Sequence, residues 1–312
     1  MNQNLAIVIP AYKPDFFKQT LQSIQDQSDQ RFSLYIFDDA SPSDLESVVK
    51  LYDFDCDLIY KHFDKNLGGQ SLVRQWERCI ENIGNEEWIW LFSDDDIMSP
   101  DCVKSFYQTA NQKPGYAAYR FNTEKISTDG EIIRENRFPE TFEGADFLNL
   151  KLSYEQESYI VEYIFSREAY RAVNGFPNLP LAWAADDLFC LKLADYRGIA
   201  TIQDGRVQWR YSDTNISGKS DRKNARRKMD ASLTFVRWIL DHKNIGEKLE
   251  PKDLPVSWYV RQIKTMEGQL TLLDELKAVL KLSFRKKDVW RLYLNMKKNR
   301  SKFVGWLKRF SS

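Results

Sequence analysis

The most informative stretch of this sequence is Glu87-Trp-Ile-Trp-Leu-Phe-Ser-Asp-Asp-Asp96, an apolar run that ends in three consecutive aspartates. A short apolar run bounded by polar residues is typical of a strand that is buried on both faces. Such strands form parallel sheets, and ligands of these sheets bind outside the carboxyl ends of the strands. The stretch therefore predicts a central strand at residues 87–92 with a polar site directly after it.

The sequence before this stretch alternates between strands and helices. Apolar runs predict strands at residues 5–9, 32–37 and 57–60, and helical periodicity predicts helices at 17–24, 45–52 and 71–82. Pro10 is expected to end the first strand. A strand, a helix and a second strand within about 35 residues form a βαβ unit, the building block of parallel sheets. The expected class is therefore α/β, with a mostly parallel central sheet flanked by helices.

The sequence after a predicted helix at residues 102–112 is less regular. Strands are expected at 116–122 and 159–165, and a hairpin at 127–134 with its turn at Asp129-Gly130. A further helix is expected to open at Asp186-Asp187 and to end near Tyr196. From residue 224 the composition is helical and polar, with a first helix at 225–242. These patterns predict a domain at 1–220 and a helical extension at 221–312.

Composition and charge restrict the class of protein. A chain of 312 residues, 43% of them hydrophobic, can bury a large core. The net charge is zero, yet 12 Lys or Arg and one acid lie from Leu276 to the end, which leaves 33 basic and 44 acidic residues before it. Because the chain before Leu276 is acidic and contains no known nucleic-acid-binding motif, nucleic-acid binding is not expected.

Cysteine usage and hydropathy indicate a compartment. The four cysteines, Cys56, Cys79, Cys102 and Cys190, show no CxxC spacing, and only two histidines are present, which argues against a zinc site. We expect buried thiols in a reducing compartment. No stretch reaches the roughly 20 apolar residues that span a bilayer. The expected location is the cytoplasm, with the protein in solution or peripheral on the inner face of the plasma membrane.

The aspartate run at residues 94–96 favours a metal site. Three adjacent carboxylates in a partly dry cleft repel one another unless a cation neutralises them. Mg²⁺ or Mn²⁺ is usually held by one or two protein carboxylates, and diphosphate oxygens and water complete its shell. The alternative is that Asp94, Asp95 and Asp96 cap the following helix.

Two more acidic pairs follow predicted element boundaries. Asp38-Asp39 comes after a strand, where carboxylates can accept hydrogen bonds from a nucleotide base or from ribose hydroxyls. The alternative there is an Asx turn with Ser41-Pro42. Asp186-Asp187 opens a predicted helix, and one of these carboxylates could act as a general base toward an acceptor hydroxyl. The alternative for this pair is helix N-capping.

Six blocks in this order resemble the family 2 glycosyltransferases of the GT-A fold, of the bacterial type that assembles polysaccharides or glycoconjugates. The blocks are Ile7-Val-Ile-Pro10-Ala11-Tyr12-Lys13, Leu21-Gln-Ser23-Ile24 with Gln27-Ser28, Ile36-Phe-Asp38-Asp39-Ala-Ser41, Asn66-Leu-Gly68, Phe92-Ser-Asp94-Asp95-Asp96-Ile-Met-Ser-Pro100, and Asn174-Gly175-Phe176 followed by Asp186-Asp187. Each block is weak alone, and the ordered set is specific over residues 4–217. The resemblance implies a catalytic domain with a nucleotide-binding half at 1–115 and an acceptor half at 116–220.

The resemblance also implies residue roles. Pro10, Ala11, Tyr12, Asp38, Asp39, Asn66, Gly68, Arg74 and Asp94 would bind the nucleotide, with Asp39 the favoured contact to the base. Asp95 is the favoured metal ligand, with Asp94 and Asp96 as neighbours because the register is open by one residue. Asp187 is the favoured catalytic base, with Asp186 as the alternative. Trp183, Arg210, Ser212 and Asp213 are candidates for the acceptor or diphosphate side.

Three positions depart from the family pattern. Asp186 stands where glutamate is frequent, so either member of that pair could be the base. Ser212 stands where a histidine often assists the metal or diphosphate, so Asp213, Arg210 or water would substitute. The Ala-Arg-Asn sequence that often follows the Asn66 block has no clean match, and Arg74 is the nearest basic residue.

The implied reaction is inverting transfer of a sugar from a nucleoside-diphosphate sugar, expected to be a UDP-sugar, to an acceptor hydroxyl. The acceptor would be a growing polysaccharide or a lipid-linked oligosaccharide, and the cofactor Mn²⁺ or Mg²⁺. The alternatives are a non-catalytic carbohydrate- or nucleotide-binding protein, which Ser212 favours, and a sugar nucleotidyltransferase, which the lack of glycine in residues 10–16 disfavours. The oligomeric state stays open.

The basic tail predicts membrane binding. Trp290, Tyr293 and Leu294, then Phe303, Trp306, Leu307 and Phe310, recur at helical spacing among basic residues. Amphipathic helices of this kind can lie in an anionic membrane surface. The alternative is that these apolar faces pack on protein.

Overall fold

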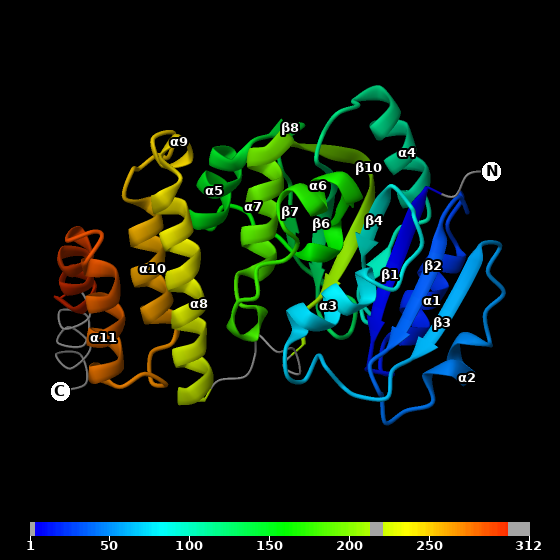
Figure 1. Cartoon of the computed structure of the whole chain (residues 1–312), viewed down its shortest axis with the longest axis horizontal. Helices are drawn as coiled ribbons and strands as arrows, with labels where there is room; N and C mark the ends of the chain where they lie inside the picture. Colours follow the sequence, from blue (N-terminus) through cyan, green and yellow to red (C-terminus); the bar gives the residue numbers. More distant parts are fainter. Residues whose placement is uncertain (1–3, 213–220, 299–312) are drawn as a thin grey trace. The chain divides into compact units, whose positions relative to one another are not determined.

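The computed structural model describes residues 4–212 and 221–298 and divides the chain into two compact units, Met1–Gly218 and Lys219–Ser312 (Figure 1). Asp213 and the predicted apolar face from Phe303 to Phe310 lie outside the described residues.

The first unit is built on one sheet, which has ten strands among residues 4–212. The strands are β1 Leu5–Ala11, β2 Ser33–Asp38, β3 Asp57–His62, β4 Trp88–Leu91, β5 Ile97–Met98, β6 Ala118–Ile126, β7 Ile132–Asn136, β8 Thr141–Phe142, β9 Tyr163–Ser166 and β10 Ile199–Arg210. Their order is β3-β2-β1-β4-β9-β6-β10-β5, with β7 on β6 and β8 on β10.

The long strands of the sheet share one direction. The β1–β2, β2–β3, β1–β4 and β6–β10 pairs are parallel, and β9 runs antiparallel to both β4 and β6. β4 and β6 therefore point the same way on either side of β9. The short strands β5, β7 and β8 are antiparallel to their partners. The expected mostly parallel sheet is confirmed.

Helices flank this sheet. They are α1 Phe17–Gln25, α2 Leu45–Val49, α3 Leu72–Ile80, α4 Cys102–Gln112, α5 Gly144–Leu152, α6 Arg167–Ala172 and α7 Ala185–Arg197, with short 3₁₀ turns at Ile160–Glu162 and Pro180–Ala182. The predicted apolar face of α1 is buried at Phe17, Leu21 and Ile24. At α3, the Ser71 side chain caps the helix by accepting a hydrogen bond from the Arg74 N–H group. The alternation of strands and helices expected from the sequence is therefore present.

Pro10 does not end β1, contrary to the prediction. The strand continues to Ala11, which pairs with Asp38 of β2. The Val8 carbonyl accepts a hydrogen bond from the N–H of Phe92, which directly follows β4. The Ala11 carbonyl accepts one from the N–H of Asp39, which directly follows β2. Because successive residues face alternate neighbours, the missing N–H of Pro10 faces the β4 side. The β4 ladder ends at Val8, so no sheet hydrogen bond is lost there.

Residues 199–210 form the longest strand, β10, which the sequence patterns did not predict. Its first half is apolar and buried, and its register against β6 shifts between Ile202 and Val207. Gly205 lies inside this irregularity with a φ of 85°. A bulge breaks the period-2 alternation on which strand prediction depends. Helices α5 and α6 were likewise not predicted.

The second unit is helical, as expected. Its helices are α8 Arg222–Asp241, α9 Lys243–Gly246, α10 Leu254–Thr265 and α11 Leu272–Ser283, and residues 288–298 are also helical. Phe235 of α8 packs edge-on against Trp258 of α10, with ring centroids 5.4 Å apart. Within residues 4–212 and 221–298, no helix combines the length and the apolar character needed to cross a membrane.

The cysteines are all free thiols and all belong to the first unit. Cys79, Cys102 and Cys190 are buried, and Cys56 is half-buried. The expectation of buried thiols is therefore confirmed for three of the four cysteines.

Trp90 is the clearest test of the core. It is fully buried in β4, stacks on Phe121 at 5.1 Å, and donates its indole N–H to the Val161 carbonyl at 2.7 Å. We expect Trp90→Ala to lower the free energy of unfolding by about 3–5 kcal/mol, because it removes a large side chain and leaves a cavity. Urea unfolding followed by far-UV circular dichroism measures this. Trp90→Phe keeps a ring and loses the hydrogen bond, so it should cost about 1–3 kcal/mol; equal losses for the two variants would contradict this assignment.

Candidate active site

The predicted site residues gather where the parallel strands end. Asp38 closes β2, Asp94 to Asp96 follow β4, and Arg210 closes β10. Tyr12 and Lys13 follow β1, and Ser127 follows β6. Because these strands run in one direction, their carboxyl ends lie on the same edge of the sheet, where ligands of α/β folds bind.

Backbone groups and one buried arginine hold the aspartate run. Asp94 Oδ2 accepts hydrogen bonds from the Tyr12 and Lys13 N–H groups, both at 2.7 Å. Asp96 Oδ1 accepts the Arg210 N–H at 2.7 Å, and the Arg210 guanidinium donates to the Asp95 carbonyl at 3.0 Å. The run therefore links β1, β4 and β10. The helix-capping alternative is wrong, because β5 follows the run and α4 begins only at Cys102.

Asp95 differs from its two neighbours. Its carboxylate is held by side chains: Oδ1 accepts the Ser93 hydroxyl, and Oδ2 lies 3.3 Å from Lys13 Nζ. The residue is nevertheless buried. Asp95 is thus the member of the run whose partners are a hydroxyl and a long cationic side chain, the partners that a bound cation displaces most readily.

The electrostatics of the run favour added positive charge. Burial and then the neighbouring charge of Asp95 raise the pKa of Asp94 to about 6, and the same two causes raise the pKa of Asp96 well above its usual value. A nearby cation reverses such shifts. Among residues 4–212 and 221–298 no group of three or more His, Cys, Asp or Glu side chains is arranged as a metal cage. A sparse protein shell is what Mg²⁺ and Mn²⁺ use when substrate phosphates complete it.

The Asp38-Asp39 pair organises the loops around it. Asp38 accepts hydrogen bonds from the Ser41 N–H and the Tyr60 hydroxyl, both at 2.7 Å, so the Asx-type contact with Ser41 is present. Asp39 accepts the Leu67 and Gly68 N–H groups at 2.7 Å on its two oxygens. Both carboxylates are buried.

The Asn66-Leu-Gly68 block serves this loop. A Cβ atom at Gly68 would lie 2.7 Å from Asp39 Oδ2, so the close approach requires glycine. Asn66 donates to the Asp39 carbonyl at 3.1 Å and accepts the Gly69 N–H at 2.7 Å. Arg78, one turn after the predicted Arg74, forms the ion pair with Asp39. Its guanidinium also lies 3.8 Å from the centroid of the Phe63 ring, whereas the Arg74 side chain is exposed.

The Asp186-Asp187 pair lies in the first turn of α7 and does not cap it. The N-cap residue is Ala184, which makes no side-chain cap, and within the first turn Asp186 Oδ1 accepts the Asp187 N–H at 2.9 Å. Asp187 Oδ1 lies 2.7 Å from Lys151 Nζ, and Lys151, on α5, also donates to the Ser158 carbonyl at 3.2 Å. Asp187 is buried and Asp186 is half-buried. The two carboxylates therefore share one environment but have different partners.

Charge separates the roles of these groups. Burial and next the charge of Asp187 raise the pKa of Asp186 to about 7. Burial would lower the pKa of Lys151, but the charges of Asp187 and Asp186 outweigh it and raise that pKa. A carboxyl group with a raised pKa beside a buried ion pair is the environment that general bases occupy.

The segment before α7 has strained backbone. Leu181, Ala182 and Ala184 adopt φ angles of 60°, 53° and 58°, a left-handed conformation that is uncommon without glycine. Such strain costs on the order of 1 kcal/mol or more per residue and concentrates at functional sites. Upstream, the Ser71 hydroxyl donates to Asn178 at 3.3 Å, which ties this region to α3.

The Asn174-Gly175-Phe176 block has a structural explanation. Gly175 has a φ of 60°, and a Cβ atom there would lie 2.8 Å from Glu77 of α3. Glu77 accepts the Phe176 N–H at 2.7 Å, and the Phe176 ring packs on Phe189 at 4.1 Å and on Trp76 at 5.2 Å. The block therefore anchors the chain between α3 and α7.

Two further predicted residues, Trp183 and Ser212, are not part of the clusters described above. Trp183 is half-buried next to the strained segment, and Ser212 is buried after β10. Sequence reasoning missed Lys13 as the partner of Asp95, Arg78 as the partner of Asp39, and Lys151 as the partner of Asp187. The signal for Arg78 was its place one turn after Arg74 on the same helix; Lys151 gave none, because α5 was not predicted.

Comparison with known proteins finds relatives of this chain. A family model described as "Glycosyl transferase family 2" matches residues 6–169, which is more than half of the chain. The GalNAc(5)-diNAcBac-PP-undecaprenol beta-1,3-glucosyltransferase of Campylobacter jejuni subsp. jejuni is 23% identical over 187 residues. That match covers 54% of this chain and only 59% of the relative's own length.

Solved structures show the same fold. Staphylococcus (S.) aureus TarS 1–349 aligns with a TM-score of 0.67 at 14% identity and covers 93% of this chain and 83% of its own. The same protein in complex with UDP-GlcNAc aligns with a TM-score of 0.66 at 13% identity, over 96% of this chain and 92% of its own. The mannosyltransferase PcManGT from Pyrobaculum calidifontis, in complex with GDP-Man and Mn²⁺, reaches 0.54 at 14% identity, over 93% and 83%. The expected GT-A fold is confirmed.

Asp186→Asn tests the shifted carboxyl group through stability. The folded state holds the Asp186 proton more tightly than the unfolded chain, whose aspartate pKa is about 4. Its contribution to stability is therefore present below pH ~4 and is lost as the pH rises through about 7. Asparagine cannot ionise, so the variant should be more stable than the parent at pH 8, on the order of 1 kcal/mol or more, and the difference should shrink as the pH falls toward 4.

Melting temperatures between pH 4 and 8 without divalent cations measure this difference. Asp195→Asn, at an exposed position of the same helix, is the matched control and should leave the pH dependence unchanged. A Asp186→Asn variant that is less stable than the parent at pH 8 would contradict the assigned environment.

Proposed function

Because the chain belongs to glycosyl transferase family 2, we propose that it transfers a sugar from a nucleoside-diphosphate sugar to an acceptor hydroxyl with inversion of the anomeric centre. The observation that carries this proposal is the joint presence of two acidic sites in one unit. One is the aspartate run at the carboxyl edge of the sheet. The other is the Asp186-Asp187 pair with its lysine partner.

The donor would lie along the carboxyl edge between β1 and β4, with its base toward Asp38 and Asp39. Pro10, Ala11 and Tyr12 border this place, and Asn66, Gly68 and the Arg78–Asp39 ion pair shape its floor. A UDP-sugar is the proposed donor, supported by the structural likeness to the protein solved with UDP-GlcNAc. Both oxygens of Asp39 already accept hydrogen bonds from backbone N–H groups. Asp39 would therefore contact a base through its remaining lone pairs.

A divalent cation, Mn²⁺ or Mg²⁺, is proposed at Asp95. The fit rests on three buried carboxylates placed side by side, where burial first and the charge of Asp95 second raise the pKa values of Asp94 and Asp96, and on the side-chain partners of Asp95. Asp94 and Asp96 would hold Asp95 in place through their bonds to β1 and β10. A bound divalent cation supplies neutralisation of the charge that develops on a leaving diphosphate. PcManGT was solved with Mn²⁺, which supports the same choice.

Asp187 is the proposed general base. Its carboxylate is buried and lies 2.7 Å from Lys151 Nζ, which fixes its position. Burial and then the charge of Asp187 raise the pKa of Asp186 to about 7, which makes Asp186 the poorer candidate for an ionised base below neutral pH. As the acceptor hydroxyl attacks the anomeric carbon, its proton would pass to Asp187 and the C–O bond to the diphosphate would break. No covalent sugar–enzyme intermediate is needed for a single displacement.

The acceptor is proposed to be a growing polysaccharide or a lipid-linked oligosaccharide. The named activity of the Campylobacter jejuni relative involves an undecaprenol-linked saccharide, which supports the lipid-linked alternative. Trp183 and the stacked pair Tyr159–Trp209, with ring centroids 4.0 Å apart, offer aromatic surfaces for a sugar. The location would be peripheral at the membrane that holds such an acceptor.

A non-catalytic binding protein is the second candidate, and Ser212 in place of the frequent histidine favours it. Release of UDP from a set of UDP-sugars, with short saccharides as acceptors, separates the two. Acceptor-dependent UDP release supports the transferase, and tight UDP binding with no release under any combination supports the binding protein.

Asp95→Ala tests the metal proposal. Loss of the cation ligand should weaken Mn²⁺-dependent UDP binding by at least about tenfold and abolish transfer, because diphosphate charge would lose its partner. Isothermal titration of UDP, with Mn²⁺ and with a chelator, measures this. Asp101→Ala changes an exposed aspartate just after the site and serves as control. UDP binding that is equal with Mn²⁺ and with chelator would remove the metal from the proposal.

Asp187→Asn tests the base. Turnover should fall by about 10²- to 10⁴-fold while UDP affinity stays unchanged, which is the usual contribution of a positioned base. Asp186→Asn should lose less turnover. Lys151→Met should lower turnover as well, and Lys151→Arg should restore part of it, since an arginine keeps the positive charge. A larger loss for Asp186→Asn than for Asp187→Asn would assign the base to Asp186.

A further inference from the structure

Helix α11 has two apolar faces, and only one of them is covered. Ala278, Val279 and Leu282 are buried within the helical unit. On the opposite side, Leu272 is 63% exposed, Leu273 58%, Leu280 48% and Phe284 81%. Residues 272, 276, 280 and 284 are spaced by four, so they follow one another along one side of the helix. A helix that is apolar on both sides is normally buried on both sides.

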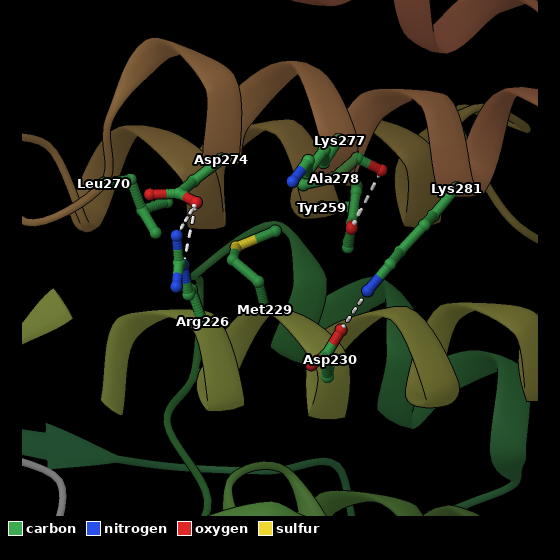
Figure 2. Close-up of a pocket in the computed structure, with 9 residues that line it drawn as sticks. All are labelled: Arg226, Met229, Asp230, Tyr259, Leu270, Asp274, Lys277, Ala278 and Lys281. Atoms are coloured by element: carbon green, nitrogen blue, oxygen red, sulfur yellow. Dashed lines mark hydrogen bonds and ion pairs between the residues drawn. The ribbon is translucent and has the colours of Figure 1, made fainter. Parts of the chain in front are cut away.

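The inner side of α11 is fixed to its neighbours, so this outer face cannot turn inward. Figure 2 shows the contacts around a small pocket of the helical unit, where Arg226 of α8 pairs with Asp274 and Lys281 pairs with Asp230 of α8. The Tyr259 hydroxyl of α10 donates to the Ala278 carbonyl at 3.2 Å. The four outward residues, Leu272, Leu273, Leu280 and Phe284, are called the α11 outer face below.

Positive charge borders the α11 outer face. Lys277, Lys281, Arg285, Lys286 and Lys287 are exposed beside it. The acidic residues of α11, Asp274 and Glu275, are buried and paired, Asp274 with Arg222 and Arg226, and Glu275 with Lys297 and the Tyr293 hydroxyl. Of the five cations, Lys281 pairs with Asp230 and Arg285 with Asp241, whereas Lys277, Lys286 and Lys287 have no ion pair among the described residues. Large exposed apolar side chains beside such lysines are the composition of helices that lie in an anionic lipid surface.

We infer that the α11 outer face is a docking surface for an anionic membrane. The inserted groups would be Leu272, Leu273, Leu280 and Phe284, and the lysines beside them would contact lipid phosphates. The inference rests on the proposed function only in that a lipid-linked acceptor gives the enzyme a reason to be at a membrane. The surface itself follows from exposure and charge.

Charge favours lipid over a protein occupant. In a two-fold dimer, the same surface of each copy would meet, so the lysines of one face would approach those of the other. The chain from residue 299 onward adds four more Lys or Arg and no acid, so it is also a poor electrostatic match. An anionic lipid surface is the partner whose charge is complementary.

The α11 outer face differs from the membrane face predicted from the sequence. Of the first predicted set, Tyr293 is buried and its hydroxyl donates to Glu275 at 2.6 Å, and Trp290 is half-buried. For Tyr293 the prediction is wrong, because this side chain packs within the unit. Leu294 remains 51% exposed.

Co-sedimentation of the full-length chain with phosphatidylcholine vesicles, with and without phosphatidylglycerol, tests the inference. The parent should bind the anionic vesicles, and less at high salt. Leu280→Ser with Phe284→Ser should reduce this binding by at least about tenfold, because two exposed anchors are lost. Lys277→Gln, Lys286→Gln and Lys287→Gln together should reduce it by about fivefold per charge and flatten its salt dependence.

Two controls separate the outcomes. Leu51→Ser with Leu58→Ser removes two exposed leucines of the first unit, 71% and 38% exposed, and should leave vesicle binding unchanged. UDP binding measured on each variant should match the parent, so failure of the donor proposal and failure of the membrane inference give different results. Equal vesicle binding by the parent and the Leu280–Phe284 variant would overturn the inference. The inference would also be overturned if the parent does not bind vesicles but forms a concentration-dependent dimer in analytical ultracentrifugation, and the Leu280–Phe284 variant does not form this dimer.

Discussion

The site depends on one buried arginine at the end of β10. Arg210 uses its backbone N–H for Asp96 and its guanidinium for the carbonyls of Asp95, Ser127 and Thr128 and for the Gln19 side chain. It thereby joins the aspartate run, the β6–β7 hairpin and α1. Burial lowers the pKa of Arg210, while the charges of Asp96 and Asp95 oppose that change. Removing a buried charge of this kind leaves its partners unpaired, which is usually more costly than the pair is stabilising. The position of the proposed metal ligand is thus set by a residue that need not touch the metal.

The sequence allowed the α/β class, the sheet direction and the place of the aspartate run to be predicted, because each rests on local patterns. Apolar runs such as 5–9 are buried throughout, and the loops after them fall at the carboxyl edge by topology alone. β10 could not be predicted, since its bulge near Gly205 interrupts alternation. Pro10 was misleading because its effect depends on whether a neighbouring strand needs its N–H, which is a property of the sheet and not of the sequence.

The partners of the acidic residues were harder to predict than the residues themselves. Lys151 and Asp187 are 36 positions apart, and their contact requires α5 and α7 to pack together. Arg78 and Arg74 are both on α3, and only the helix orientation selects which one reaches Asp39. The same limit applied to the tail, where an apolar pattern at 290–294 indicated an amphipathic helix but could not show which neighbour covered it. Long-range charge pairing is set by the tertiary structure, so single-sequence patterns identify candidates and leave their protonation states open.

The distribution of thiols has a practical consequence for following unfolding. Cys56, Cys79, Cys102 and Cys190 all lie in the first unit, and three of them are buried. The helical unit contains no cysteine anywhere in residues 219–312. A thiol reagent therefore reaches the three buried cysteines only when the first unit opens, and it is insensitive to events confined to the helical unit. Thiol modification therefore follows the opening of one of the two units. Its rate can be compared with the rate of unfolding measured by tryptophan fluorescence, which reports on both units.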